Sequence, residues 1–238
     1  MTDLRLADAR EAADLGAFLA RLIRFDKAAA VRLQTAHLGL AVFGRLPLGD
    51  SGPLAVRTAQ LAEEAPADLT VSAGQLLEAV DAVTAAEPAG IPPVPPVAPA
   101  TVPAQDRPQQ PAPVVALPAP ITGPAWAGLL PPRKGWEHLA DLPTEPLRAA
   151  VRAAVTEFRR EDAAPDALAE SIWSRQLHPS GLTVRAVHAA HLVGLLQQAD
   201  SLALYRHPAW LRLSAPRGYV IVRRAPAPGT GLGLSPMR

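Results

Sequence analysis

Apolar positions in the N-terminal part of the chain repeat first with a helical period and then with a strand period. After Asp8 and Glu11, which form a capping pair, large apolar residues recur three and four positions apart and predict a helix over residues 9–24. Residues 30–43 are rich in strand-forming side chains. A turn-forming run then separates them from residues 54–61, which predicts an antiparallel return.

A second helix completes this N-terminal unit. Ser72 with Gln75 forms another capping pair, and the apolar residues that follow predict a helix ending near Thr84. His37 lies inside the predicted strand region without a nucleophile or acid at a catalytic spacing, so we interpret it as a packed or solvated side chain. These elements predict a small α+β domain over residues 1–87.

The C-terminal part shows helical periodicity followed by alternation. Capping residues and apolar spacing predict three helices, and short alternating runs around a Pro-Arg-Gly turn predict a terminal β-hairpin. The helices are expected over 144–160, 166–176 and 184–196, and the strands over 202–205, 210–213 and 219–223. This order of helices and strands resembles the winged-helix form of the helix-turn-helix fold, from about Thr144 to Arg224.

The winged-helix resemblance implies a nucleic-acid contact. In such domains the third helix enters the major groove and the hairpin turn reaches the backbone or the minor groove. The resemblance places three candidates on or before that helix, one at the tip of the hairpin and two at the end of its returning strand. These tentative nucleic-acid-binding residues are Thr183, Arg185, His188, Arg217, Arg223 and Arg224.

Proline dominates the middle of the chain. Between Pro88 and Pro132 there are 15 prolines, which remove backbone donors and fix φ, so neither a helix nor an interior strand is expected there. We interpret residues 88–132 as an extended, disordered linker between the N-terminal domain and a basic winged-helix-like domain over 133–226. Residues 227–238 are expected to be a disordered tail. The predicted fold class is therefore α+β, in two tethered domains.

The charges are balanced overall but unevenly placed. The chain has 23 basic and 22 acidic residues, yet residues 1–90 hold 8 basic and 12 acidic side chains, whereas residues 131–238 hold 14 and 9. This asymmetry predicts an anionic partner for residues 171–224, most often a nucleic acid, or an acidic face elsewhere in the same chain. A protein partner is expected for the N-terminal domain.

The composition argues against an enzyme. The absence of cysteine excludes disulfide scaffolds, cysteine-ligated metals and thiol nucleophiles. His178, His188, His191 and His207 occur close together in the sequence, but Asp200 is the only nearby acid, so we attribute their spacing to chance and assign them no role. No catalytic residue, metal or cofactor is predicted.

The remaining signals concern compartment and overall role. We find no secretory signal and no apolar run long enough for a membrane span, so a soluble, cytoplasmic protein without membrane contact is expected. An excess of Arg over Lys, with abundant Ala and Pro, is typical of high-GC actinobacteria. We interpret the chain as a two-domain adaptor or regulator whose C-terminal domain binds nucleic acid or protein. The alternative is a protein–protein scaffold without nucleic-acid contact.

Overall fold

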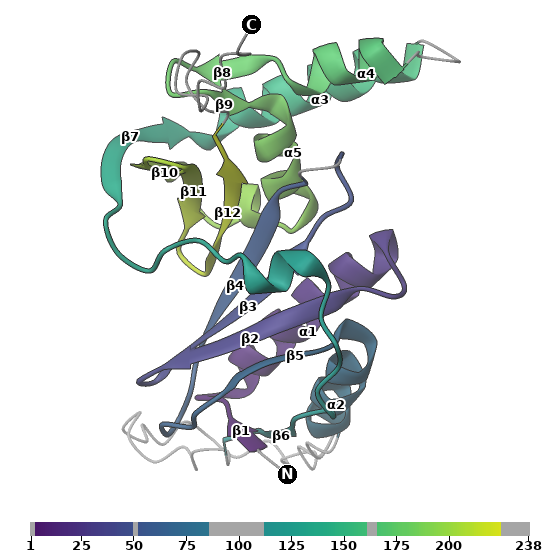
Figure 1. Cartoon of the computed structure of the whole chain (residues 1–238), viewed down its shortest axis with the longest axis vertical. Helices are drawn as coiled ribbons and strands as arrows, with labels where there is room; N and C mark the ends of the chain where they lie inside the picture. Colours follow the sequence, from purple (N-terminus) through teal and green to yellow (C-terminus); the bar gives the residue numbers. More distant parts are fainter. Residues whose placement is uncertain (1–2, 50–51, 86–111, 161–165, 225–238) are drawn as a thin grey trace, which may run out of the picture.

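The computed structural model describes residues 3–49, 52–85, 112–160 and 166–224 (Figure 1). Its strands are β1 (Asp3–Arg5), β2 (Ala30–Ala36), β3 (Gly39–Arg45), β4 (Leu54–Gln60), β5 (Asp68–Ser72), β6 (Val114–Ala116), β7 (Glu137–Pro143), β8 (Gln176–His178), β9 (Leu182–Thr183), β10 (Ser201–His207), β11 (Trp210–Ala215) and β12 (Gly218–Arg223). Its helices are α1 (Ala9–Phe25), α2 (Ala73–Ala85), α3 (Thr144–Arg160), α4 (Asp166–Trp173) and α5 (Val184–Leu192), with 3-10 turns η1 (Ala125–Gly128) and η2 (Leu195–Gln197).

One antiparallel sheet of eight strands runs through both halves of the chain. Its order is β5-β2-β3-β4-β12-β11-β10-β7, and β4 pairs directly with β12. Alternation along each strand points one set of apolar side chains toward the helices, where they form the main core with α1, α2, α3 and α5. The predicted α+β class is confirmed, and the sheet is larger than the sequence indicated.

The two halves of the sheet repeat the same unit. In the N-terminal half, α1 leads into the meander β2-β3-β4, and the edge strand β5 runs directly into α2. In the C-terminal half, the edge strand β7 runs directly into α3, and α5 precedes the meander β10-β11-β12. The strand–helix pair therefore follows the meander in one half and precedes it in the other, which makes the halves permuted copies of one architecture.

The winged-helix prediction is wrong. The predicted wing, β11–β12, lies in the middle of the sheet, because β12 pairs on its other side with β4 from Gly218↔Arg57 to Ile221↔Leu54. The predicted recognition helix α5 buries most of its residues against α3 and β12, so it has no free face for a major groove. The sequence predicts the order of these elements, but that order does not determine which strand edges become partners.

Local predictions were more accurate than the topology. The predicted helix boundaries hold for α1 and α3, and the Asp8 carboxylate accepts a hydrogen bond from the Glu11 backbone amide at 2.8 Å. His37 lies in the β2–β3 turn with φ 51°, and not within a strand as predicted. The edge strands β5 and β7 were missed because DLTVS and EHLADLP contain Asp, Ala and Pro, which are uncommon in strands.

Part of the predicted linker is folded. Strand β6 pairs with β1, and Val115 and Leu117 are buried in the main core, so the prediction of an unstructured spacer is wrong for residues 112–132. Proline is compatible with this arrangement because β6 lies in a short two-stranded pair rather than inside the large sheet. Residues 88–111 and the predicted tail 227–238 lie outside the described residues, and the domain boundaries remain predictions.

Candidate binding groove

The sheet face turned away from α1, α2, α3 and α5, called here the open face, is crossed by residues 121–136, the connecting segment. The Ile121 amide donates to the Thr70 carbonyl on β5 at 2.9 Å, which fixes the start of this segment against the sheet edge. Further along, Ala127 of η1 is buried. Figure 1 shows this segment as the teal chain in front of the sheet. A second apolar layer thus forms on the open face, with Phe43, Leu54, Val56, Trp210 and Ile221 buried in it.

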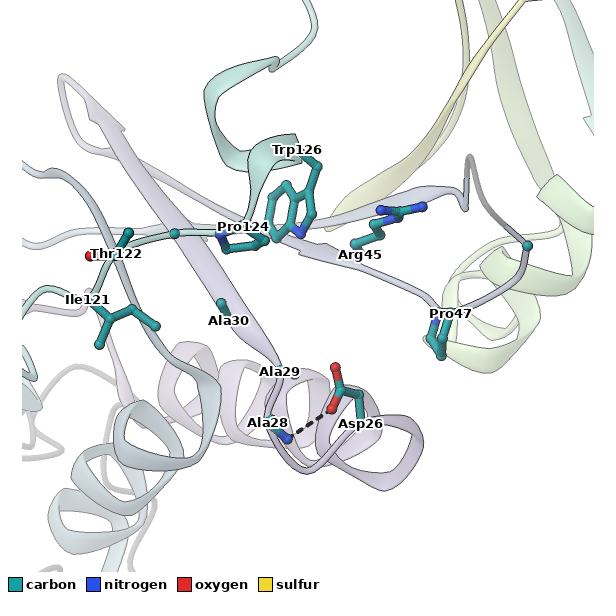
Figure 2. A pocket seen from close by; sticks show the side chains of 12 residues that line it. Asp26, Ala28, Ala29, Ala30, Arg45, Pro47, Ile121, Thr122, Pro124 and Trp126 are labelled. Carbon is teal, nitrogen blue, oxygen red and sulfur yellow. Dashed lines mark hydrogen bonds between the residues drawn. The ribbon is translucent and has the colours of Figure 1, made fainter.

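Two adjacent cavities along the connecting segment share two of their lining residues. The larger has a volume of about 860 Å³ and the smaller about 240 Å³, and Arg45 and Trp126 line both. Figure 2 shows the larger cavity, with the Trp126 ring and the Arg45 side chain lying on the same side of it. The smaller cavity is lined by Arg45, Gly52, Leu54, Ala125, Trp126, Leu129, Trp210, Ile221 and Arg223. We call these two cavities the groove.

The groove combines aromatic surface with positive charge. The Arg223 guanidinium lies 4.7 Å from the centre of the Trp210 ring, and Trp210 itself is 8% exposed. Leu129 on the rim is 60% exposed. Among the described residues that line the groove, only Asp26 carries a carboxylate, and one of its oxygens accepts the Ala28 amide at 2.9 Å (Figure 2). The groove therefore offers apolar contact and cationic hydrogen-bond donors together.

The structure does not bring the predicted nucleic-acid-binding residues together. Arg217, the predicted wing tip, forms an ion pair with Asp14 of α1. Arg185 forms an ion pair with Glu170 and lies against Gly49. Both side chains therefore make contacts within the molecule rather than extending from a wing or a recognition helix.

The other predicted residues are equally dispersed. Thr183 caps α5 by accepting the Ala186 amide at 3.4 Å, and His188 stacks on Trp173 with ring centres 4.7 Å apart. Arg224 donates its backbone amide to the Ala209 carbonyl. Of the six residues, only Arg223 lines the groove. The nucleic-acid assignment of these residues depended on an exposed wing and a recognition helix, so it stays a prediction.

A buried charge network joins the two halves where β4 pairs with β12. Arg57 of β4 is 4% exposed and donates to Glu11 at 3.2 Å and to Asp14 at 3.3 Å. It also donates to the Arg217 carbonyl at 2.5 Å. Burial lowers the pKa of Arg57 and raises the pKa of Glu11. The positive charge of Arg57 opposes part of this rise in the pKa of Glu11. The sequence contains no signal for this network, because it depends on β4 pairing with β12.

The described residues contain no group of three or more His, Asp or Glu side chains that could hold a metal ion. Of the four neighbouring histidines in the sequence, His178 contacts Ser180 and His207 packs on Trp136. Across the same part of the chain, no helix is both long and apolar enough to cross a bilayer.

Comparison with known proteins gives matches for both halves. Residues 1–102 match the model of a domain of unknown function (DUF8010), and residues 131–227 match that of another domain of unknown function (DUF8185). No curated protein matches the chain.

Among solved structures, the chain resembles a DNA polymerase sliding clamp from Pseudomonas aeruginosa, with 11% identity and a TM-score of 0.49 over 96% of this chain and 66% of that chain. A beta sliding clamp from C. crescentus gives 13% identity and a TM-score of 0.45 over 96% and 66%. The chain spans just under two thirds of the length of these clamps. The winged-helix prediction, already overturned by the sheet topology, gains no support from these neighbours.

Proposed function

We propose that the chain is a non-enzymatic, protein-binding adaptor that holds an extended segment of a partner protein in the groove. The partner segment carries acidic side chains next to large apolar ones. The observation that carries this proposal is the placement of Trp126, Trp210 and Arg223 in one groove on the open face.

The groove has the features of a peptide-binding surface. Tryptophan supplies large contact area with little loss of side-chain entropy, and Trp and Arg are the residues that most often dominate interface energies. The stacked position of Arg223 on Trp210 orients its guanidinium before binding, which favours hydrogen bonds to a carboxylate. Among the described residues Arg223 forms no ion pair that would compete with such a ligand.

The distribution of charge supports a protein partner. Among the described residues, six arginines of the C-terminal half form ion pairs, five with carboxylates of the same half and Arg217 with Asp14 of the N-terminal half. The arginines with such ion pairs in this half are Arg148, Arg152, Arg175, Arg185, Arg206 and Arg217. Paired arginines have fewer free donors for a phosphate backbone. The scaffold alternative is therefore the better supported of the two original interpretations.

The lining of the groove also favours binding over catalysis. Among the described residues that line it, Arg45, Arg223 and Asp26 are charged and Thr122 carries a hydroxyl, and none is a histidine, lysine or tyrosine. An activated hydroxyl nucleophile requires a base within hydrogen-bond reach, and the described lining residues show no such pair (Figure 2). Cationic and apolar side chains instead suit the recognition of an acidic, apolar ligand.

Selection from a library of random displayed peptides on the full-length chain tests this function. We expect enrichment of peptides that combine Asp or Glu with aromatic or aliphatic residues. Anisotropy titration with one labelled selected peptide should show at least about tenfold weaker binding for Trp126→Ala and for Arg223→Glu, which is about 1.4 kcal/mol for each. Arg159→Glu, with the same charge change on α3, is the matched control and should bind normally.

Two outcomes would contradict the proposal. The first is a selection that yields no acidic, apolar peptides. The second is a selected peptide whose affinity is unchanged by both groove substitutions or falls equally with the Arg159 control, since binding would then occur elsewhere or through net charge alone.

A further inference from the structure

A second pocket lies further along the open face, beyond the groove. It has a volume of about 260 Å³ and is formed by strands of both halves together with the end of the connecting segment. Its walls include the apolar side chains Phe43 and Ile221, and its polar groups include Thr58 and Tyr219. Arg133 and Arg212 also line it, whereas no carboxylate occurs among the described residues that line it. We call it the Arg212 pocket.

Arg212 is held in this pocket by aromatic rings instead of acids. Its guanidinium carbon lies 4.4 Å from the ring centre of Tyr205, 4.6 Å from that of Trp136 and 5.5 Å from that of Tyr219. The buried Nε atom has no hydrogen-bond partner, and no described carboxylate pairs with this side chain. Burial lowers the pKa of Arg212, as expected for a cation without a counter-charge.

This arrangement of the half-buried Arg212 contrasts with that of Arg57, a fully buried arginine. Arg57 is more deeply buried than Arg212, but Glu11 and Asp14 balance its charge. Cation–π contacts with three rings orient Arg212 and stabilise its charge, yet they leave its buried Nε–H without an acceptor. An anion in the adjacent pocket would supply both the acceptors and the counter-charge.

We propose that the Arg212 pocket binds a small anionic ligand whose carboxylate or phosphate contacts Arg212 and whose flat apolar body packs against the pocket walls. The volume of about 260 Å³ is close to the lower limit of typical small-molecule sites, which fits a ligand of about one ring with one charged group. Arg133 also lines the pocket and adds a second positive charge. This charge opposes part of the rise that burial causes in the pKa of the Tyr219 hydroxyl. The Thr58 and Tyr219 hydroxyls line the same space and can donate to the anion.

This proposal is independent of peptide binding in the groove. The two sites share Ile221 as a lining residue but differ in every cation that lines them, because the groove has Arg45 and Arg223. Loss of binding at one site therefore does not predict loss at the other. A ligand in the Arg212 pocket would contact both halves of the sheet and the connecting segment at once.

Calorimetric titration of the full-length chain with four probes tests the proposal: benzoate, phenyl phosphate, inorganic phosphate and the uncharged benzamide. We expect at least one aromatic anion to bind at least about tenfold more tightly than benzamide and than inorganic phosphate. Tighter binding of phenyl phosphate would identify a phosphate ester as the natural head group, and tighter binding of benzoate a carboxylate. Arg212→Gln should weaken the preferred anion at least about tenfold, whereas Arg206→Gln, on the adjacent strand, should not.

Arg133→Gln keeps the test valid if the Arg212 variant does not fold, because Arg133 is exposed and its replacement leaves the aromatic packing intact. It should weaken the anion several-fold. The proposal is wrong if no aromatic anion binds, if benzamide or inorganic phosphate binds as tightly as the preferred aromatic anion, or if the affinity is unchanged in both Arg212→Gln and Arg133→Gln.

Discussion

The two halves of the molecule share one architecture but differ at the ends that meet. At the junction of β4 with β12, the N-terminal half contributes the carboxylates Glu11 and Asp14 from α1. The C-terminal half contributes Arg217 from the β11–β12 turn, directed at Asp14. Part of the charge asymmetry of the sequence is therefore used inside the molecule. Two copies of one unit can join through a continuous sheet when their facing charges are opposite.

The halves also differ in what they add to the common unit. Residues 161–183 are inserted in the C-terminal half between α3 and α5, and the described part of this insertion contains α4 and the short β8–β9 pair. The groove and the Arg212 pocket belong to neither half alone, because each is lined by residues of both halves and of the connecting segment. Binding in either site should therefore depend on an intact junction.

The largest effect is expected from Arg57→Met, which removes the cation at the centre of the junction. Glu11 would then lose its partner Arg57, whereas Asp14 would keep Arg217, in a site where Arg57 is almost fully buried. Removing one partner of a buried ion pair typically costs 3–5 kcal/mol, and because both carboxylates are partly exposed we expect about 3 kcal/mol. Urea unfolding followed by circular dichroism measures this loss.

Arg5→Met is the control for this substitution. Arg5 pairs with Glu63 at 3.1 Å on the surface, so its loss should cost at most about 0.5 kcal/mol. A change of equal size in the two variants would mean that the junction network does not stabilise the protein.

A slightly smaller effect is expected from Gly218→Ala, which tests the strand pairing itself. Gly218 pairs with Arg57, and an added Cβ would lie 2.3 Å from the Val56 carbonyl oxygen, so β12 and β4 would have to separate. We expect a loss of about 2 kcal/mol in the free energy of unfolding. Gly128→Ala meets no atom within 4 Å and should leave stability nearly unchanged. If the Gly218 variant were as stable as this control, the pairing of the halves would be in doubt.

Sequence reasoning predicted the elements well where local signals act alone. Asp8 and Thr183 both cap helices as expected, because capping depends on residues only three positions apart. The hairpin strands β10, β11 and β12 were also placed within a few residues. Their partner β4 is far away in the sequence, and nothing in a single sequence indicates that long-range pairing.

The same limit explains what was missed in the candidate sites. Arg223 was selected for its charge and does line the groove, but Trp126 lies in the segment interpreted as a spacer because of its prolines. Arg217 was assigned to DNA because an exposed hairpin tip was assumed, whereas the tip contacts α1. A charged residue can be identified from the sequence, but its partner depends on the fold.

Equivalent positions in the two halves should differ in their contribution to stability. Thr144, at the β7–α3 junction, is 2% exposed and donates through its hydroxyl to the Ala199 and Asp200 carbonyls. Ser72, at the β5–α2 junction, makes only a long cap contact of 3.5 Å with the Gln75 amide. Thr144→Val should cost about 1.5 kcal/mol and Ser72→Ala about 0.5 kcal/mol in urea unfolding. Equal losses would contradict the view that the β7–α3 connection is more constrained than the β5–α2 connection.

The smallest effect concerns pH and separates the halves once more. Burial, aided by the neighbouring His191, lowers the pKa of His188 in the C-terminal half, so the folded state favours the neutral ring stacked on Trp173. Above the ordinary histidine pKa of about 6.5 both states are neutral and nothing is lost. As the pH falls below that value the unfolded chain takes up a proton first, so the stability contributed by His188 declines until the pH passes the lowered pKa.

Melting temperatures measured between pH 7.5 and 5.5 should therefore fall less for His188→Gln than for the unmodified chain. The control His37→Gln, at the exposed β2–β3 turn, should follow the unmodified chain. Parallel curves for all three proteins would show that His188 does not carry this dependence.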